Sequence, residues 1–272
     1  MVINQENLIR PTATLSVTWE KLPNDFVLEE EPVENTGQPL IAGALREPLE
    51  LTGYIRAEML IASNLGICAK VNGEWVVKAP DWFYVPQVQP FPQRSARRSY
   101  TPHAEGDIPS VVMEFLSDTD GGEYSVKRTY PPGKWFFYEQ ILKVPTYTIF
   151  EPETGLLEVY RLREQRYELE LPNPDGRHWL DEMGLFLGVW RGEKEGRTGY
   201  WLRWWDEAGN LLLWGVEFLE QERQRAEQER QRAEQERQHA EQERQRAEQE
   251  CQRAEKLAAY LRSQGINPDE IE

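Results

Sequence analysis

Residues 111–117 read VVMEFLS and place one acid, Glu114, among apolar neighbours. Successive side chains of a strand point to opposite faces, so Glu114 would share one face with Val112 and Leu116. The other face would carry Val111, Met113 and Phe115. A buried carboxylate is costly to ionise unless a cation or several hydrogen-bond donors compensate it. The run therefore predicts a buried strand, and Glu114 is the first candidate for a functional residue.

Two charged residues on other segments could act together with Glu114. Asp81 lies within a second strand-like run at residues 75–85. Lys134 begins a predicted helix over residues 134–142, which Pro-Pro-Gly introduces. Two strand-borne acids and a lysine can hold a hard divalent cation and a phosphate group together. The series therefore favours chemistry on a phosphate.

The residues alone leave a second interpretation of this series open. Asp81 could cap a turn after Pro80, and Glu114 could form an ordinary salt bridge with Lys127 or Lys134. That arrangement needs no metal ion, because the lysine would compensate the buried carboxylate. The two interpretations differ in how the protein should respond to a divalent cation.

The patterns along the chain favour an α/β fold. Further elements are expected as a helix at residues 40–51 that kinks or ends near Pro48, and strands at 66–71, 146–150, 156–162 and 166–171. The predicted helix at 134–142 lies between two strands, which suits an α/β arrangement. Two other segments are a short strand entering an acidic turn at residues 25–32 and a long surface loop at residues 86–109.

Tryptophan is concentrated between Leu185 and Trp214. Several of these residues flank a turn at residues 206–210, as a hairpin would arrange them. Aromatic side chains at this density could form a platform for stacking bases. Their spacing fits packing in the core and at sheet edges better, so we expect a structural role.

From Gln221 the chain repeats the seven-residue unit QERQRAE, with His239 and Cys251 as its departures. Each Glu has an Arg three or four positions away, and nothing breaks a helix before Gly265. Alanine fills one core position of the heptads, but arginine fills most of the other, where a strong zipper needs Leu or Ile. We expect a weak coiled coil about 65–80 Å long, with a lone charged helix as the alternative. A coiled coil over residues 216–264 could hold two chains together as a homodimer.

The charge balance argues against simple adsorption to nucleic acid. The net charge is −16, whereas proteins that grip long stretches of phosphate usually present a basic face. Short basic clusters occur at Arg94, Arg97 and Arg98 and at Lys127 and Arg128. A DNA partner would therefore need local steering against the overall field.

The remaining bulk features point to the cytoplasm. Cys68 and Cys251 lie in different regions and indicate neither a zinc site nor a disulfide framework. The first residues lack the basic-then-apolar pattern of a signal peptide, and no apolar run approaches membrane-spanning length. We therefore expect a cytoplasmic protein with no membrane partner.

Several segments resemble the Uma-two family of restriction endonucleases, a cyanobacterial family within the PD-(D/E)xK nuclease superfamily. The candidate residues stand in KAPD at 78–81, VMEFLS at 112–117 and GKWFFY at 133–138. The flanking segments are VPTYTIF at 144–150, LEVYRL at 157–162 and the tail YLRSQGINPD at 260–269. The resemblance covers roughly residues 20–172 and implies a restriction-endonuclease-like mixed β-sheet flanked by helices.

The resemblance also implies roles for the candidate residues. Asp81 and Glu114 would bind Mg²⁺ or Mn²⁺, aided by the carbonyl of Phe115. The ion would polarise a scissile phosphate and lower the pKa of the attacking water. Lys134 would stabilise developing charge or orient that water.

The chain departs from the superfamily pattern at two points. Leu116 stands where a lysine usually follows the glutamate by two residues, and the family places its lysine on the next helix, where Lys134 fits. Lys127 competes for that role, because the segment before Lys134 is longer than usual. Gln38 stands near the point where the family often has a histidine.

We therefore expect three segments: a restriction-endonuclease-like domain at residues 1–215, a heptad-repeat helix at 216–264 and a tail at 265–272. The expected function is metal-dependent hydrolysis of phosphodiester bonds, with DNA as the first candidate substrate. One alternative is an inactive nuclease fold that acts through its C-terminal coiled coil. Another is a hydrolase of a small phosphorylated ligand, which would suit the acidic charge.

Overall fold

The computed structural model describes residues 15–21, 23, 36–91, 96–116 and 122–265. The chain forms two units that divide between Trp214 and Gly215. The strand expected at residues 25–32 and the basic residue Arg94 lie outside the described residues. Each unit is described below by itself.

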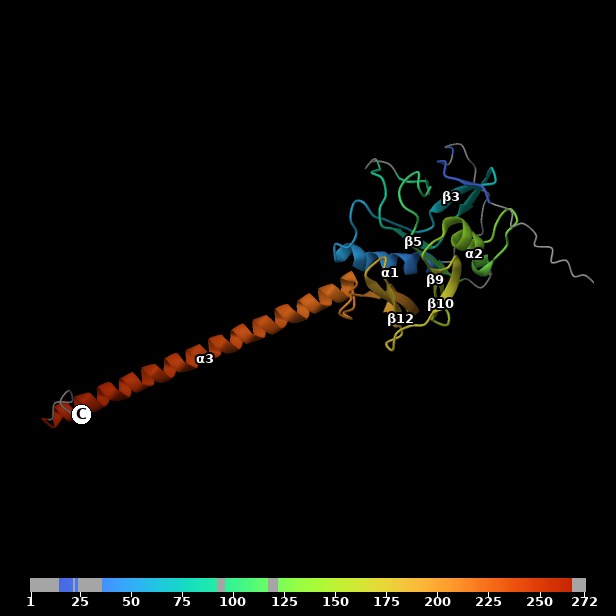
Figure 1. Cartoon of the computed structure of the whole chain (residues 1–272). Coiled ribbons are helices and arrows are strands. Elements are labelled where there is room, and N and C mark those ends of the chain that lie inside the picture. Colours follow the sequence, from blue (N-terminus) through green and yellow to red (C-terminus); the bar gives the residue numbers. More distant parts are fainter. Residues whose placement is uncertain (1–14, 22, 24–35, 92–95, 117–121, 266–272) are drawn as a thin grey trace, which may run out of the picture. The chain divides into compact units, whose positions relative to one another are not determined.

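A six-stranded sheet lies at the centre of the first unit (Figure 1). Its strands are, in order, β10 (Arg166–Glu170), β9 (Leu156–Arg163), β8 (Thr146–Glu151), β7 (Val111–Phe115), β5 (Trp82–Val85) and β2 (Leu60–Ala62). β7 and β8 are parallel, with Glu114 opposite Ile149, and the other neighbouring strands are antiparallel. A parallel pair needs a long crossover. That crossover contains the 3₁₀ turn η1 (Gly122–Tyr124), the helical turn α2 (Lys134–Phe136) and the π-helical segment η2 (Phe137–Leu142). The expected mixed α/β fold is confirmed.

The alternation of β7 separates two apolar cores. Val111, Met113 and Phe115 belong to a core shared with α1 (Gly37–Leu51) and the tryptophan-rich strands. Val112 belongs to the other core, which includes α2 and η2 residues, and Leu116 packs against it. Figure 1 accordingly shows α1 and α2 on opposite sides of the sheet. Glu114 is fully buried within β7, as its position in the sequence predicts.

A smaller sheet contains β1 (Val17–Thr18), β3 (Gly66–Val71), β4 (Glu74–Lys78) and β6 (Ser99–Tyr100). The single strand predicted over residues 75–85 is wrong, because β4 ends in this sheet and β5 starts in the six-stranded one. Pro80 lies in the connection and has no N–H to donate to a sheet. Its carbonyl accepts a hydrogen bond from the N–H of Asn64 at 3.0 Å. Asp81 therefore stands between two sheets rather than inside a strand.

The surface loop predicted over residues 86–109 is also wrong at its centre. There β6 pairs in parallel with β3, and the side chains of Tyr100 and Thr101 are fully buried. The Tyr100 hydroxyl donates to the carbonyl of Asp107 at 2.5 Å and closes the segment onto itself. A strand of two residues is too short to show a periodic pattern in the sequence.

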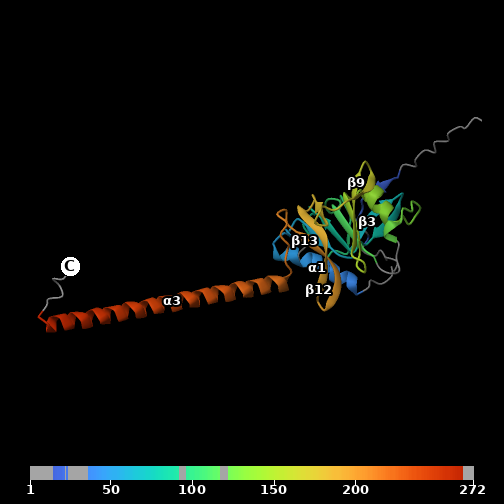
Figure 2. The same cartoon turned by 90° about the horizontal axis from the view of Figure 1, so that it is seen from below.

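The third sheet packs against α1 and shares one apolar core with α1 and the six-stranded sheet. It contains β11 (Arg177–Leu180), β12 (Leu185–Lys194) and β13 (Arg197–Trp205), and Figure 2 shows it beside α1. Pro48 has no N–H for the carbonyl of Ala44 four residues earlier, and the Trp214 indole donates to that carbonyl at 2.9 Å. The Trp204 indole donates to the Leu45 carbonyl, also at 2.9 Å. The helix consequently continues through Pro48 to its end at Leu51.

The packing role expected for the tryptophans is confirmed. Trp201, Trp204 and Trp214 are buried in the core beside α1, so their faces are not open for stacking bases. The long hairpin of β12 and β13 turns at Glu195 and Gly196, not at residues 206–210. Residues 206–210 form a separate turn that brings Leu211 back to β13.

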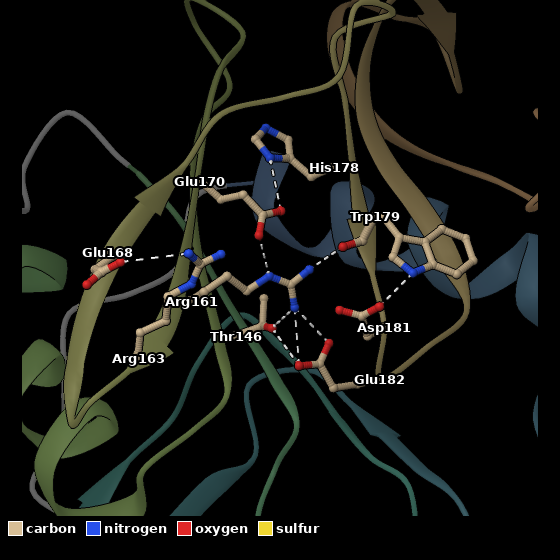
Figure 3. Close-up of polar contacts among 9 residues, drawn as sticks. All are labelled: Thr146, Arg161, Arg163, Glu168, Glu170, His178, Trp179, Asp181 and Glu182. Atoms are coloured by element: carbon tan, nitrogen blue, oxygen red, sulfur yellow. Dashed lines mark hydrogen bonds and ion pairs between the residues drawn. The ribbon is translucent and has the colours of Figure 1, made fainter.

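A buried arginine joins the six-stranded sheet to the third sheet (Figure 3). Arg161 of β9 is 8% exposed, and its Nε donates to Glu170 at 3.0 Å. Its Nη1 donates to Glu182 at 2.9 Å and to the Thr146 hydroxyl at 2.5 Å, and its Nη2 donates to the carbonyl of Trp179. These partners come from β8, β10, β11 and the turn after β11, so one guanidinium fixes four segments.

The second unit contains the helix α3 (Gly215–Ser263) of 49 residues, about 74 Å long at 1.5 Å per residue. Figures 1 and 2 draw it as one uninterrupted helix. None of the side chains between Gly215 and Ser263 is buried, and pairs such as Glu222 with Arg225 lie on its surface, 3.0 Å apart. The expected helix is confirmed, and the coiled coil stays a prediction. Among the described residues, no helix combines the length and apolar character needed to cross a bilayer.

Candidate active site

The three predicted site residues meet at one end of β7. The Lys134 ammonium lies 3.1 Å from Oε2 of Glu114. Asp81 reaches the same strand from the β4–β5 connection, where its Oδ2 accepts the N–H of Phe115 at 2.5 Å. The Tyr138 hydroxyl donates to the other oxygen of Glu114 at 2.9 Å. The fold therefore brings the predicted residues together, although Asp81 arrives from a connection and not from a strand.

The Glu114 carboxyl is held in an environment that disfavours its charge. Burial raises its pKa to about 8, and the charge of Asp81 adds to that rise. The Lys134 ammonium and the Tyr138 hydrogen bond act in the opposite direction but do not cancel it. Because a further cation would favour the ionised form, this carboxyl suits a place beside a metal ion.

Lys134 is held as an ammonium ion. Burial alone lowers its pKa, but the charges of Glu114, Glu123 and Asp81 outweigh burial and raise the pKa above its usual value. Lys127, the competing lysine, is exposed. Lys134 is therefore the lysine that compensates Glu114, a contact common to both interpretations of the sequence.

Glu123 is a member of this cluster that the sequence did not reveal. It is 4% exposed and its Oε1 lies 3.3 Å from the Lys134 ammonium. Its Oε2 is buried and has no hydrogen-bond partner among the described residues. The Tyr147 hydroxyl donates to its backbone carbonyl at 3.0 Å and fixes η1 against the sheet. The residue follows two glycines in an irregular segment, so neither periodicity nor an apolar run marks it.

The oxygen atoms of the site fit a hard divalent cation. Asp81 and Glu114 supply carboxylates, and the carbonyl of Phe115 accepts the Gln38 amide at 2.9 Å. Mg²⁺ prefers such ligands and often takes only one or two carboxylates, with water and substrate phosphate completing its shell. Within the described residues, no group of three or more His, Cys, Asp and Glu side chains is arranged to hold a metal ion by itself. A cation held here would therefore need water and substrate to complete its shell.

An open pocket gives solvent access to Asp81. It lies between α1 and the turn that joins β2 to β3 and is lined by Gln38, Pro39, Ala42, Gly43, Arg46, Ser63, Asn64 and Asp81. Gln38, near the start of α1, both lines this pocket and contacts the Phe115 carbonyl. Asp81 and Gln38 thus line the pocket and are hydrogen-bonded to the backbone of Phe115, the residue after Glu114.

The model of the family Uma2, described as "Putative restriction endonuclease", matches residues 48–192. The matched segment contains Asp81, Glu114, Glu123 and Lys134, whereas Gln38 precedes it. No curated protein matches the chain.

Proposed function

The chain belongs to the Uma2 family of restriction endonucleases, and on that premise we propose that it is a metal-dependent endonuclease that hydrolyses phosphodiester bonds in DNA. The observation that carries the proposal is the meeting of Asp81, Glu114 and Lys134 at one end of β7. Acids that hold a cation and a lysine that faces the same point are the groups needed to neutralise a phosphate in its transition state.

Asp81, Glu114 and the Phe115 carbonyl would hold Mg²⁺ or Mn²⁺. When bound, the ion supplies charge for the scissile phosphate and lowers the pKa of a water molecule. Lys134 keeps its proton and places a fixed positive charge beside Glu114. Tyr138 holds the second oxygen of Glu114 and so restricts how that carboxylate can turn. The protein contributes orientation and charge that are in place before the substrate arrives.

Titration calorimetry tests the metal site without any assumption about substrate. Mn²⁺ should bind the wild type, and Glu114→Gln should lose that binding. The matched control is Glu168→Gln on β10, because the Glu168 side chain is 59% exposed and lies 3.9 Å from exposed Arg163. Equal Mn²⁺ binding by Glu114→Gln and wild type would refute the proposed ligand.

A cleavage assay tests the reaction itself. Wild type with Mg²⁺ or Mn²⁺ should nick plasmid DNA, Glu168→Gln should match it, and Glu114→Gln should leave the plasmid intact. Equal cleavage by wild type and Glu114→Gln would point to a contaminating nuclease.

The exposed helix α3 favours a second candidate function, in which the nuclease fold displays an arm for self-association or partner capture. All of its side chains between Gly215 and Ser263 are accessible, and the repeat offers the same surface along its whole length. Removal of residues 219–272 separates the two functions, because a metal site would survive it and partner capture would not. Light scattering that shows a monomer at high concentration would exclude the homodimer.

A further inference from the structure

The pocket beside Asp81 has a floor made of small residues. Pro39, Ala42 and Gly43 of α1 line it on one side, and Ser63 and Asn64 line it on the other. We call this pocket the α1 groove. Its lining is polar or small along most of its length, and Arg46 lies one helical turn beyond Ala42.

Gly43 is not required by the structure of α1. It is exposed within a helix of 15 residues, and a Cβ built on it would meet no atom within 4 Å. A glycine inside a helix costs about 1 kcal/mol relative to alanine. Neither backbone conformation nor internal packing accounts for this cost. Space left open at a glycine is what the close approach of another backbone needs.

The opposite wall of the α1 groove is tied to the candidate catalytic acid. Asn64 has a φ of +50°, a left-handed conformation that asparagine tolerates better than most residues. Its N–H donates to the carbonyl of Pro80 at 3.0 Å, directly before Asp81. The wall and Asp81 are thus parts of one hydrogen-bonded unit, so a ligand held by the wall is also positioned relative to Asp81.

Arg46 supplies the positive charge of the α1 groove. Its Nη1 donates to the Ile61 carbonyl at 2.9 Å, and its Nε and Nη2 both donate to Oε1 of Glu50, at 3.1 and 2.9 Å. Nη1 and Nη2 each carry a second N–H that can point to another acceptor. The Arg46 side chain is 42% exposed, and an exposed pair of this kind is worth little. A phosphate can therefore share the guanidinium with Glu50. Asp81 would repel the same phosphate unless a cation is bound, so binding should depend on the metal.

We propose that the α1 groove holds a single polynucleotide strand, with its sugar–phosphate backbone crossing Gly43 and a phosphate facing Arg46. This inference rests on the proposed function and names its substrate class. One pocket whose lining contains one arginine suits one strand, and the net charge of −16 disfavours the many phosphate contacts that a duplex makes. An unpaired strand also bends into such a groove without the cost of deforming a duplex.

Binding of a short fluorescent single-stranded DNA tests this proposal. Anisotropy is measured on the full chain with Ca²⁺ in place of Mn²⁺, and the probe is recovered to confirm that it stays intact. Gly43→Phe should weaken binding about tenfold or more, which is about 1.4 kcal/mol. Leu51→Phe is the matched control, because Leu51 is an exposed residue of α1 outside the α1 groove. The control should bind the probe as the wild type does.

A second variant guards against a folding defect. Arg46→Gln should weaken binding and reduce its dependence on salt, since one phosphate contact is lost. Thermal melts of both variants show whether the domain still folds. Wild-type affinity in Gly43→Phe and Arg46→Gln would overturn the proposal, as would a wild type that binds the DNA probe weakly or prefers a duplex of the same sequence.

The Mn²⁺ titration distinguishes this inference from the proposed function. Gly43→Phe should bind Mn²⁺ as the wild type does, because Gly43 contributes no metal ligand. Loss of DNA binding with Mn²⁺ binding intact supports the α1 groove. If Gly43→Phe binds Mn²⁺ and nicks plasmid DNA as the wild type does, the α1 groove is not the strand-binding site. The proposed nuclease function would be unaffected by that result.

Discussion

Two cationic side chains, the buried Arg161 and the partly buried Lys134, each lie between two glutamates in this domain, and their surroundings differ. Arg161 lies between Glu170 and Glu182, and all three of its guanidinium nitrogens have partners (Figure 3). Lys134 lies between Glu114 and Glu123, where one carboxylate oxygen of Glu123 has no hydrogen-bond partner in the described part of the chain and the pKa of Glu114 is raised. A matched buried network fixes a fold, whereas a mismatched one leaves charge for a ligand to compensate.

The geometry of the two cations explains part of this difference. A guanidinium presents five donors in a rigid plane and can hold several segments at once. An ammonium is a compact point charge, so it can sit beside a phosphate without imposing a fixed arrangement. The planar guanidinium of Arg161 is thus suited to joining several segments. The compact ammonium of Lys134 is suited to a place beside a ligand.

The largest expected effect is the loss of stability in Arg161→Met. It would leave the carboxylates of Glu170 and Glu182, which are 25% and 19% exposed, without the buried cation between them. We expect a cost of about 3 kcal/mol, the lower end of the range for breaking a buried ion pair. Arg163→Met on the same strand is the control, since the Arg163 side chain is 62% exposed and 3.9 Å from Glu168. That variant should change the free energy of unfolding by about 0–1 kcal/mol. Urea unfolding measures the free energy of unfolding of both variants. Equal losses in the two would show that the Arg161 network does not stabilise the fold more than an exposed pair does.

Lys134→Met should lower activity strongly and stability moderately. Cleavage should fall about 10²–10³-fold, the loss typical of removing one group that stabilises transition-state charge. The free energy of unfolding should fall by about 1–3 kcal/mol, since Glu114 can take up a proton once its cation is gone. Lys127→Met is the control and should leave cleavage unchanged, because Lys127 is exposed. The opposite pattern, with Lys127 needed and Lys134 dispensable, would reverse the assignment of the lysine.

These contrasts also show what the sequence could reveal. Glu114 could be found because every residue of β7 is buried, so an acid interrupts a local apolar pattern. The helix α3 could be found because its residues favour a helix by themselves. Asp81 was placed in the wrong element, since the two strands around Pro80 join different sheets, and only tertiary contacts decide that.

Glu123 and the Arg161 network could not be found in this way. Glu123 is buried by the contacts of its segment with Lys134 and Tyr147, which lie 11 and 24 residues away. Arg161 alternates with apolar residues in β9 and has the pattern of an exposed position. Its partners come from four other segments, so its role depends on how the sheets meet.

The pH dependence of stability should separate the two networks. Glu114 has a pKa of about 8 in the folded protein, above its value in the unfolded chain. The folded state therefore binds more protons between about pH 5 and pH 8, and the free energy of unfolding should fall as pH rises through this range. The raised pKa of Lys134 adds no slope there, because that group stays protonated in both states. Glu114→Gln should remove the slope and Glu182→Gln should keep it, as denaturant unfolding across the range would show.

A metal ion should compete with the proton on Glu114 for the same carboxylate. A cation at Glu114 requires the ionised carboxylate, so Mn²⁺ binding should release a proton and should strengthen as pH rises toward 8. Calorimetry in two buffers with different enthalpies of ionisation counts the protons released. A binding enthalpy that is the same in both buffers would mean that Glu114 is already ionised before the metal arrives.

The smallest expected effect is the change in the free energy of unfolding in Glu123→Gln. It is the most direct test of the difference between the Lys134 and Arg161 networks. Oε2 of Glu123 makes no hydrogen bond to a described residue, so an amide at that place loses little, and we expect a change within about 1 kcal/mol. The same substitution at Glu182, whose two oxygens both accept from Arg161, should cost about 1.5–3 kcal/mol. Mn²⁺ affinity should nevertheless fall about tenfold in Glu123→Gln, as it does when a group that orients a metal site is removed. A large loss of stability with unchanged Mn²⁺ affinity would make Glu123 a structural partner of Lys134, equivalent to Glu182 beside Arg161.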